Sequence, residues 1–297
     1  MSKPNLSRRT LLRYSAVGLA AVGGGSLLAA CEVTNPDTGQ AEGAGIQQRI
    51  DSGQPVRIAV ANEPPYTKLG ADGELSGASP DVTKAVLERM GVSAVKGVQT
   101  DYDSMIPGLG ADRWDIVSAG LFMNKTRCSK VLYASPDIVS TESFAVPAGN
   151  PKGLTTVDDV KRSDVVVAVL AGSYELKTAK SLGIEEGKLQ TYPKAPDAMQ
   201  GMSDGRVDAV LLPTLTLRSH KEQYGGDFEI TDPLESFPVT GAGAAFRKSD
   251  SDFHAKFDAE LREFKKTEEF ARILEQWGFD AEPSREATTE ELCATEG

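Results

Sequence analysis

The sequence predicts an α/β protein whose body has two lobes joined by two chain crossings. Strand–helix–strand alternation occurs between residues 56 and 119, and again between residues 165 and 212. A late strand and two amphipathic helices follow, with no third sheet of their own. The simplest arrangement returns these last elements to the first lobe, so the chain crosses twice between the lobes.

The first lobe begins with a compact apolar strand over 56–61. A helix is expected over 80–90, because its apolar residues share one helical face; they are Val82, Ala85, Val86 and Met90. Ser79 is the expected N-cap and Gly91 the expected stop. Further elements follow in order: a strand over 92–98, a helix over 101–110 and a strand over 115–119. We expect these strands to form a parallel sheet.

The second lobe begins with the wholly apolar run 165–170, typical of a strand buried on both faces. Ser173 is positioned to cap a helix over 174–182 that Gly183 ends. A helix over 197–205 and a strand over 207–212 complete the repeat.

The closing segment contains a strand over 243–247 and two helices with apolar residues about 3.6 positions apart. These residues are Phe253, Phe257, Leu261 and Phe264, then Phe270, Ile273, Leu274 and Trp277. Crossings are expected near 143–148 and 238–243. The predicted boundaries are 55–144 plus 242–280 for lobe 1 and 145–241 for lobe 2. Two crossings make a hinge, and a cleft between lobes is a common ligand site.

The N-terminus has the pattern of an export signal over residues 1–31. It contains four cations and no acid, then an apolar run that ends Leu28-Ala29-Ala30-Cys31. The pair Arg8-Arg9 resembles a twin-arginine signal, and the run before Cys31 resembles a lipoprotein signal in which Cys31 is lipidated. The alternative is a single transmembrane anchor, although the run is glycine-rich and short for a span. Residues 32–54 are expected to be a flexible tether, and residues 281–297 a loose acidic tail.

The charge of the chain limits its partners. The 297 residues carry a formal charge of −11, from 32 Lys+Arg and 43 Asp+Glu. Without the four leader cations, 28 basic residues face 43 acidic ones, a charge of −15. This excess of acid argues against nucleic acid as a partner. With 2 His and 3 Cys there is little for a metal site, and we expect no metal and no cofactor.

The order of signal, lipid-type cysteine, tether and α/β body resembles family 3 of the ABC-transporter solute-binding proteins, the amino-acid-binding class. The resemblance covers about residues 55–280. It rests on three segments: Asn62–Thr67 with Gly73–Gly77 and Pro80–Val82, Gly120–Arg127, and Gly205–Val210. It implies a type II periplasmic-binding-protein fold whose lobes are joined by a two-strand hinge. A narrower resemblance, to the ectoine- and hydroxyectoine-binding proteins, rests on Ala61–Thr67, Ala119–Met123 with Arg127-Cys128, and Gly243–Lys248.

The resemblance implies a site at the loops that follow the strands. Arg127 would bind a carboxylate through its two parallel donors; alternatively it is a surface arginine in a salt bridge. Tyr66, Tyr102 and Phe122 would enclose a delocalised cation such as the ectoine amidinium; alternatively they pack in the core. Tyr66 stands where relatives often have Phe.

Two acids and a serine complete the implied site. Glu63 would accept hydrogen bonds from the ligand cation, or else is a solvated loop acid. Ser173 and Glu175 begin a helix whose N-terminus favours an anion, although Glu175 is also an ordinary first-turn acid. Amino-acid binders usually place Asp after the strand over 207–212, but this chain has Leu212-Pro213-Thr214. An ordinary amino acid with a primary ammonium is therefore disfavoured, and Thr214 is a further candidate contact.

Cys128 adjoins Arg127, and relatives pair this cysteine with one before the Gly-Ala-Ala-Phe strand. This chain has Thr240-Gly241 there, so either Cys293 pairs with Cys128 or Cys128 is a buried free thiol.

The expected function is capture of ectoine or hydroxyectoine, or of a related zwitterion, and delivery to an ABC permease and its ATPase. The protein is expected to be a monomer outside the cytoplasmic membrane, held there by its lipid. Polar amino acids and proline betaine are alternative ligands. A dehydratase-like enzyme is the alternative from another class, but the chain has no nucleophile–histidine arrangement, so we expect no catalytic residue.

Overall fold

The computed structural model describes residues 34–35, 40–41 and 45–296. The predicted signal, with Cys31, lies outside these residues. The chain divides into two units, Met1–Ala41 and Glu42–Gly297. In the first unit, β1 (Thr34–Asn35) pairs antiparallel with β2 (Gln40–Ala41). None of the helices in the described residues has the length and apolar character needed to cross a bilayer.

The sheet of the first lobe has five strands and is mixed. In spatial order its strands are β6 (Val95–Gln99), β3 (Val56–Val60), β7 (Ile116–Val117), β16 (Ala245–Phe246) and β8 (Leu132–Tyr133). β3 pairs parallel with β6 and β7, as the alternation predicted. The parallel pairing expected for these three strands is thus confirmed. β16, which returns from the second lobe, adds antiparallel pairs with β7 and β8 and makes the whole sheet mixed.

Four helices of the first lobe lie close to their predicted positions: α2 (Ala78–Arg89), α3 (Tyr102–Gly110), α9 (Ser251–Phe264) and α10 (Glu268–Gln276). A short helix that was not predicted, α4 (Lys125–Cys128), carries Arg127. A short hairpin, β4 (Lys68–Leu69) and β5 (Leu75–Ser76), precedes α2.

α2 begins earlier than expected, with Gly77 rather than Ser79 at the N-cap. At Gly77 φ is 115°, and a Cβ would lie 2.6 Å from Thr67 Cα, so only glycine fits beside the chain at Tyr66–Thr67.

The apolar faces of α9 and α10 explain why these helices return to the first lobe. The four periodic residues of α9 are all buried, as are Phe270 and Leu274 of α10. Trp277 is half-buried, and its indole N–H donates to Asp81 of α2 at 2.8 Å. Both helices therefore pack on the first lobe through the faces that the periodicity predicted.

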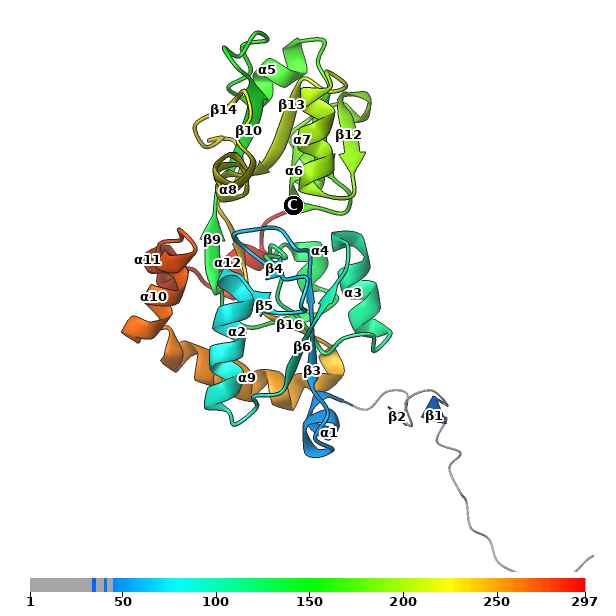
Figure 1. Cartoon of the computed structure of the whole chain (residues 1–297), viewed down its shortest axis with the longest axis vertical. Helices are drawn as coiled ribbons and strands as arrows, with labels where there is room; N and C mark the ends of the chain where they lie inside the picture. The colour runs from blue at the N-terminus through cyan, green and yellow to red at the C-terminus, as the bar shows by residue number, and fades with distance from the viewer. Residues whose placement is uncertain (1–33, 36–39, 42–44, 297) are drawn as a thin grey trace, which may run out of the picture. The chain divides into compact units, whose positions relative to one another are not determined.

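The sheet of the second lobe also has five strands. In spatial order they are β12 (Leu189–Tyr192), β11 (Val167–Leu170), β13 (Ala209–Pro213), β10 (Glu142–Pro147) and β14 (Phe228–Ile230). The helices of this lobe are α5 (Val157–Arg162), α6 (Tyr174–Ser181), α7 (Ala195–Ser203) and α8 (Thr214–Tyr224). The predicted cap of α6 is confirmed, since the Ser173 hydroxyl accepts from the Leu176 N–H at 3.2 Å. Figure 1 shows these elements grouped apart from α2, α3, α9 and the first sheet.

A two-strand hinge joins the lobes. β9 (Ile138–Ser140) pairs antiparallel with β15 (Thr240–Ala242), and β9 lies between the two groups of elements in Figure 1. β10 already begins at Glu142. The first crossing therefore lies before the expected 143–148, and the second lobe begins nearer 142 than 145. The second crossing is made by β15.

The expected tether ends earlier than predicted, because Ile46–Asp51 forms a helix, α1. Ile46 is buried, and the guanidinium of Arg49 lies 3.2 Å from the buried carboxylate of Asp115. Arg57 also contacts Asp115, at 2.8 Å. Burial alone would raise the pKa of Asp115, but the hydrogen bonds and charge of Arg57 and the charge of Arg49 lower it. This buried charge cluster fixes α1 to the first sheet.

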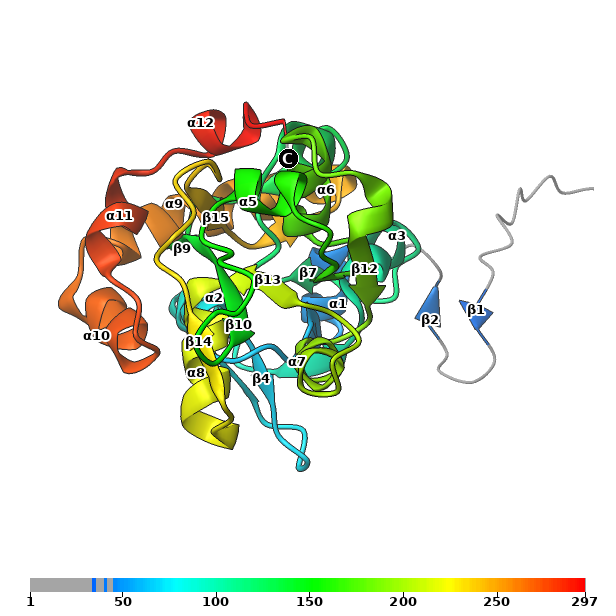
Figure 2. The same cartoon turned by 90° about the horizontal axis from the view of Figure 1, so that it is seen from above.

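The expected loose tail is instead ordered. α11 (Ala281–Glu286) and α12 (Thr289–Cys293) continue from α10 along one side of the molecule (Figure 2). Cys293 forms a disulfide with Cys128, with the Cα atoms 5.8 Å apart, so Cys128 is not a free thiol. The N–H of Lys125 donates to the Thr295 carbonyl at 3.0 Å. The tail thus holds α4, the helix that carries Arg127.

Replacement of Cys293 by Ser tests this attachment. We expect the free energy of unfolding to fall by about 2–5 kcal/mol, because the disulfide closes a long loop in the unfolded chain, with 165 residues of sequence separation. Urea denaturation followed by circular dichroism measures the change. Reduced wild-type protein is the matched control and should match the variant; equal midpoints for oxidised wild type and variant would contradict the prediction.

Candidate ligand site

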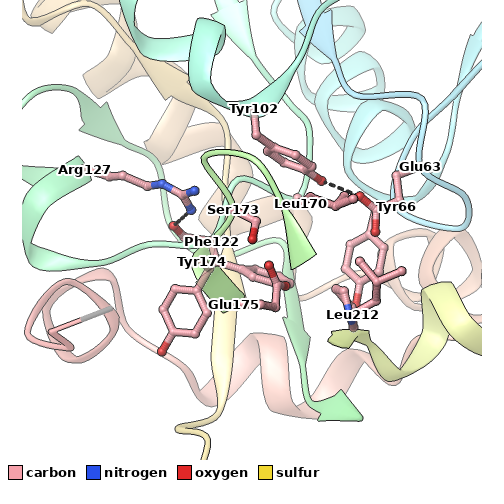
Figure 3. Close-up of a pocket in the computed structure, with 12 residues that line it drawn as sticks. Glu63, Tyr66, Tyr102, Phe122, Arg127, Leu170, Ser173, Tyr174, Glu175 and Leu212 are labelled. Atoms are coloured by element: carbon pink, nitrogen blue, oxygen red, sulfur yellow. Dashed lines mark hydrogen bonds between the residues drawn. The ribbon is translucent and has the colours of Figure 1, made fainter. Parts of the chain in front are cut away.

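A cavity lies where the carboxyl ends of strands from both lobes meet. It contains about 300 Å³ of space between atoms, part of it open to solvent. Its lining residues come from both lobes: Glu63, Tyr66, Tyr102, Gly120, Phe122 and Arg127 from the first, and Leu170, Ser173, Tyr174, Glu175, Leu212 and Pro213 from the second. Seven of the eight predicted ligand residues are among them (Figure 3).

The predicted aromatic residues line the cavity together. The rings of Tyr66 and Phe122 are 5.9 Å apart and nearly perpendicular, at 80°. Phe122 meets Tyr174 in the same way, at 5.9 Å and 89°. Tyr66 and Phe122 are buried, as the core-packing alternative supposed, yet both also line the cavity. The phenol of Tyr66 forms a hydrogen bond with Ser140 of the hinge strand β9.

Glu63 is a buried acid, not a solvated loop residue, with 5% of its side chain exposed. Its carboxylate accepts from the Tyr102 hydroxyl at 3.1 Å and from the Thr216 hydroxyl at 2.8 Å. Burial and the nearby charge of Glu175 raise the pKa of Glu63 to about 7, although the two hydroxyl donors oppose the change. A cation in the cavity would favour the ionised form of this carboxylate.

Arg127 is buried at the junction of the lobes, in contrast to the surface residue of the alternative interpretation. Its guanidinium donates to the Phe122 carbonyl at 2.6 Å and, across the lobes, to the Gly172 carbonyl at 2.9 Å. Asn124 caps the short helix α4 by accepting from the Arg127 N–H at 2.8 Å. At Gly172 φ is 70°, and a Cβ would lie within 2.8 Å of the Asp103 backbone, so glycine permits this close approach of the lobes.

The start of α6 supplies Ser173, Tyr174 and Glu175, all buried. Glu175 lies near a third buried acid, Glu142, which begins β10 directly after the hinge. Burial and the charge of Glu175 raise the pKa of Glu142 well above its usual value. Two acids, Glu63 and Glu175, therefore line the cavity together with Arg127, and Glu142 lies near Glu175.

Thr214 is the predicted residue that does not line the cavity. Its hydroxyl donates to the Thr141 carbonyl at 3.0 Å and meets the Ser143 hydroxyl at 2.8 Å, within the second lobe. Leu212 and Pro213 line the cavity instead, because β13 continues to Pro213 and turns Thr214 into α8.

Sequence reasoning missed Tyr174, which lines the cavity, and two residues next to its lining: Glu142, which lies near Glu175, and Thr216, which donates to Glu63. Tyr174 stands between two residues that were predicted, so its position at the helix start was an available signal. Nothing in the local pattern singled out Glu142 or Thr216, since each approaches its neighbour in the site only through tertiary packing: Glu142 within the second lobe, and Thr216 across the two lobes.

Comparison with known proteins identifies the family. The sequence model of the bacterial extracellular solute-binding proteins, family 3, matches residues 56–280. The chain belongs to this family. Its fold is accordingly the type II periplasmic-binding fold, as the resemblance implied.

Individual relatives agree with this assignment. The chain is 31% identical over 267 residues to the "Probable amino-acid ABC transporter periplasmic-binding protein y4tE" of Sinorhizobium fredii, covering 86% of this chain and 88% of the relative. The crystal structure of EhuB in complex with hydroxyectoine matches with a TM-score of 0.79 and 37% identity, over 84% of this chain and 98% of EhuB. An ancestral arginine-binding protein bound to arginine matches with a TM-score of 0.68 and 27% identity, over 75% and 97% of the two chains. This family member is thus an amino-acid-type ABC solute-binding protein.

Replacement of Glu63 by Gln tests the raised pKa of this acid. At pH values between the ordinary pKa of a glutamate and about 7, Glu63 carries a proton in the folded state but not in the unfolded state. The free energy of unfolding of the wild type therefore falls as the pH rises from 5 to 8. The stability of Glu63→Gln relative to wild type should therefore increase between these pH values, by on the order of 1–3 kcal/mol. Urea denaturation at pH 5 and pH 8 measures it, with Glu88→Gln, at an exposed position of α2, as the matched control. A relative stability of Glu63→Gln that does not change with pH would contradict the prediction.

Proposed function

We propose that this solute-binding protein captures ectoine or hydroxyectoine between its lobes and delivers it to the permease of an ABC importer. One observation carries the proposal: Arg127, Glu63 and the aromatic residues line a single cavity to which both lobes contribute. Ectoine combines one carboxylate with a ring amidinium. The cavity offers a fixed guanidinium for the first, and aromatic faces with a buried acid for the second.

The two charged groups of the ligand would contact different parts of the site. Arg127 would bind the carboxylate, assisted by the backbone N–H groups at the start of α6 beside Ser173. Tyr66, Tyr102, Phe122 and the newly found Tyr174 would surround the ring, and Glu63 would accept its N–H groups. Glu175 extends the acidic side of the cavity. The EhuB structure supports this assignment, since it contains hydroxyectoine and is 37% identical to this chain.

A cationic amino acid is the second candidate ligand. The three buried acids Glu63, Glu142 and Glu175 favour a positive ligand, and an arginine-bound relative shares the fold. Against this, β13 ends at Pro213 and Thr214 follows it, so no acid is present there to bind an α-ammonium. Proline betaine and polar amino acids such as glutamine are further alternatives. Turnover of any of these compounds by the pure protein would instead indicate a dehydratase-like enzyme.

The proposal includes the cellular setting. We infer export through the twin-arginine signal and lipid attachment at Cys31, which would tether a monomer outside the cytoplasmic membrane. Ligand contacts with both lobes would favour the closed arrangement, and this arrangement would dock on the permease and its ATPase.

Calorimetry with pure protein tests the ligand. We expect micromolar or tighter binding of ectoine, and weaker binding of arginine, glutamine and proline betaine. Arg127→Lys should weaken ectoine binding at least tenfold, about 1.4 kcal/mol, because an ammonium cannot reproduce the two parallel donors. Phe122→Ala should have an effect of similar size through loss of a ring face.

Arg218→Lys is the matched control for the arginine replacement, because Arg218 lies exposed on α8. Its affinity should equal that of wild type. Stronger binding of glutamine or arginine than of ectoine would overturn the proposed ligand.

A further inference from the structure

One side-chain hydrogen bond connects the ligand-binding acid of the first lobe to a helix of the second. The Thr216 hydroxyl, on α8, donates to the Glu63 carboxylate at 2.8 Å. Both side chains are buried, with 3% of Thr216 and 5% of Glu63 exposed. A donor and an acceptor shielded from water in this way lose a partner when the lobes separate.

The Glu63–Thr216 bond lies between two spaces. Glu63 lines the ligand cavity, and Glu63 and Thr216 together line a second, larger space of about 870 Å³ that is partly open to solvent. We call this second space the vestibule. It lies between the segment from Asn62 to Ala71 in the first lobe and residues of α7 and α8, including His220 and Tyr224, in the second. The bond therefore forms part of the wall between the cavity and the vestibule.

We propose that Thr216 is the latch of the closed site: its hydroxyl holds the two lobes together at Glu63 and thereby slows ligand release into the vestibule. The inference rests on the proposed function of the cavity and adds a positioning residue to it. Thr216 does not line the cavity, so it acts through Glu63.

The hydrogen-bonding capacity of a carboxylate makes the two roles of Glu63 compatible. Its oxygens accept from Tyr102 and from Thr216, one bond each. A carboxylate has about four acceptor sites, so others remain for the N–H groups of a ligand. The Tyr102 bond lies within the first lobe, whereas the Thr216 bond crosses to the second. Only the Thr216 bond therefore couples the orientation of Glu63 to lobe closure.

The hydrogen bond from Arg127 to the Gly172 carbonyl, described above, also joins the two lobes, but it is less suitable for a test of closure. Arg127 is itself a proposed ligand contact, so replacing it changes binding and closure together. Thr216 allows a more specific test, because valine has nearly the same shape as threonine and carries a methyl group in place of the hydroxyl.

Stopped-flow kinetics with ectoine tests the latch. Thr216→Val should raise the dissociation rate about tenfold and leave the association rate within twofold, because the lost bond belongs to the closed state. Thr216→Ser keeps the hydroxyl and should restore slow dissociation. Ser219→Ala, which removes a vestibule hydroxyl from the same helix, is the matched control and should behave as wild type. A dissociation rate of Thr216→Val within twofold of wild type would overturn the latch.

A measurement without ligand separates this inference from the proposed function. Fluorescent labels on cysteines at the exposed positions Asp72 and Glu222 report the distance between the lobes by energy transfer. Thr216→Val should lower the fraction of closed molecules relative to wild type, and Thr216→Ser should not. If wild type does not bind ectoine, the proposed ligand fails, and a lower closed fraction in Thr216→Val still supports the latch. An unchanged closed fraction would contradict the latch whatever the ligand.

Discussion

The pairing of β9 with β15 joins the two lobes, and the ligand site is built around it. Ser140, the last residue of β9, meets the hydroxyl of Tyr66 in the cavity wall. The Gly241 carbonyl of β15 accepts from the Met123 N–H at 2.8 Å, next to Phe122. Thr240 donates to the Glu142 carboxylate at 3.3 Å. Rotation about the hinge therefore moves groups that are bonded to the site itself.

The electrostatics of the site depend on burial between the lobes. Glu63, Glu142 and Glu175 are all shielded from water, and the first two have raised pKa values for that reason. Buried acids without a nearby cation are costly in their ionised form. The arrangement therefore favours a ligand that brings positive charge, while Arg127, which lines the same cavity, favours a negative group. A small zwitterion meets both requirements.

The tail contributes to the site in a way that its composition did not indicate. Residues 281–297 are rich in Glu and Thr, which led to the expectation of a loose segment. The disulfide between Cys293 and Cys128 and the bond between Thr295 and Lys125 instead hold it against α4. A segment far away in the sequence therefore stabilises α4, the helix that carries Arg127. Sequence could name Cys293 only as one of two possibilities, since spacing does not determine pairing.

Local patterns determined most elements of the fold, and the family resemblance supplied the candidates for the site. The periodicity of the α9 and α10 residues, the apolar run at β11 and the cap at Ser173 each depend on neighbours in the sequence, and each was predicted correctly. Seven of the eight ligand candidates, which the family resemblance supplied, line one cavity. Loops that follow parallel strands gather at one edge of a sheet, which brings candidates from separate segments together. Three features became known only from the tertiary structure. They are the mixed pairing of the two sheets, the helices formed by residues 46–51 and by the tail, and the positions of Glu142, Thr214 and Thr216 relative to the cavity. These depend on contacts between segments far apart in the chain, and such contacts leave no periodic or compositional signal in either segment alone.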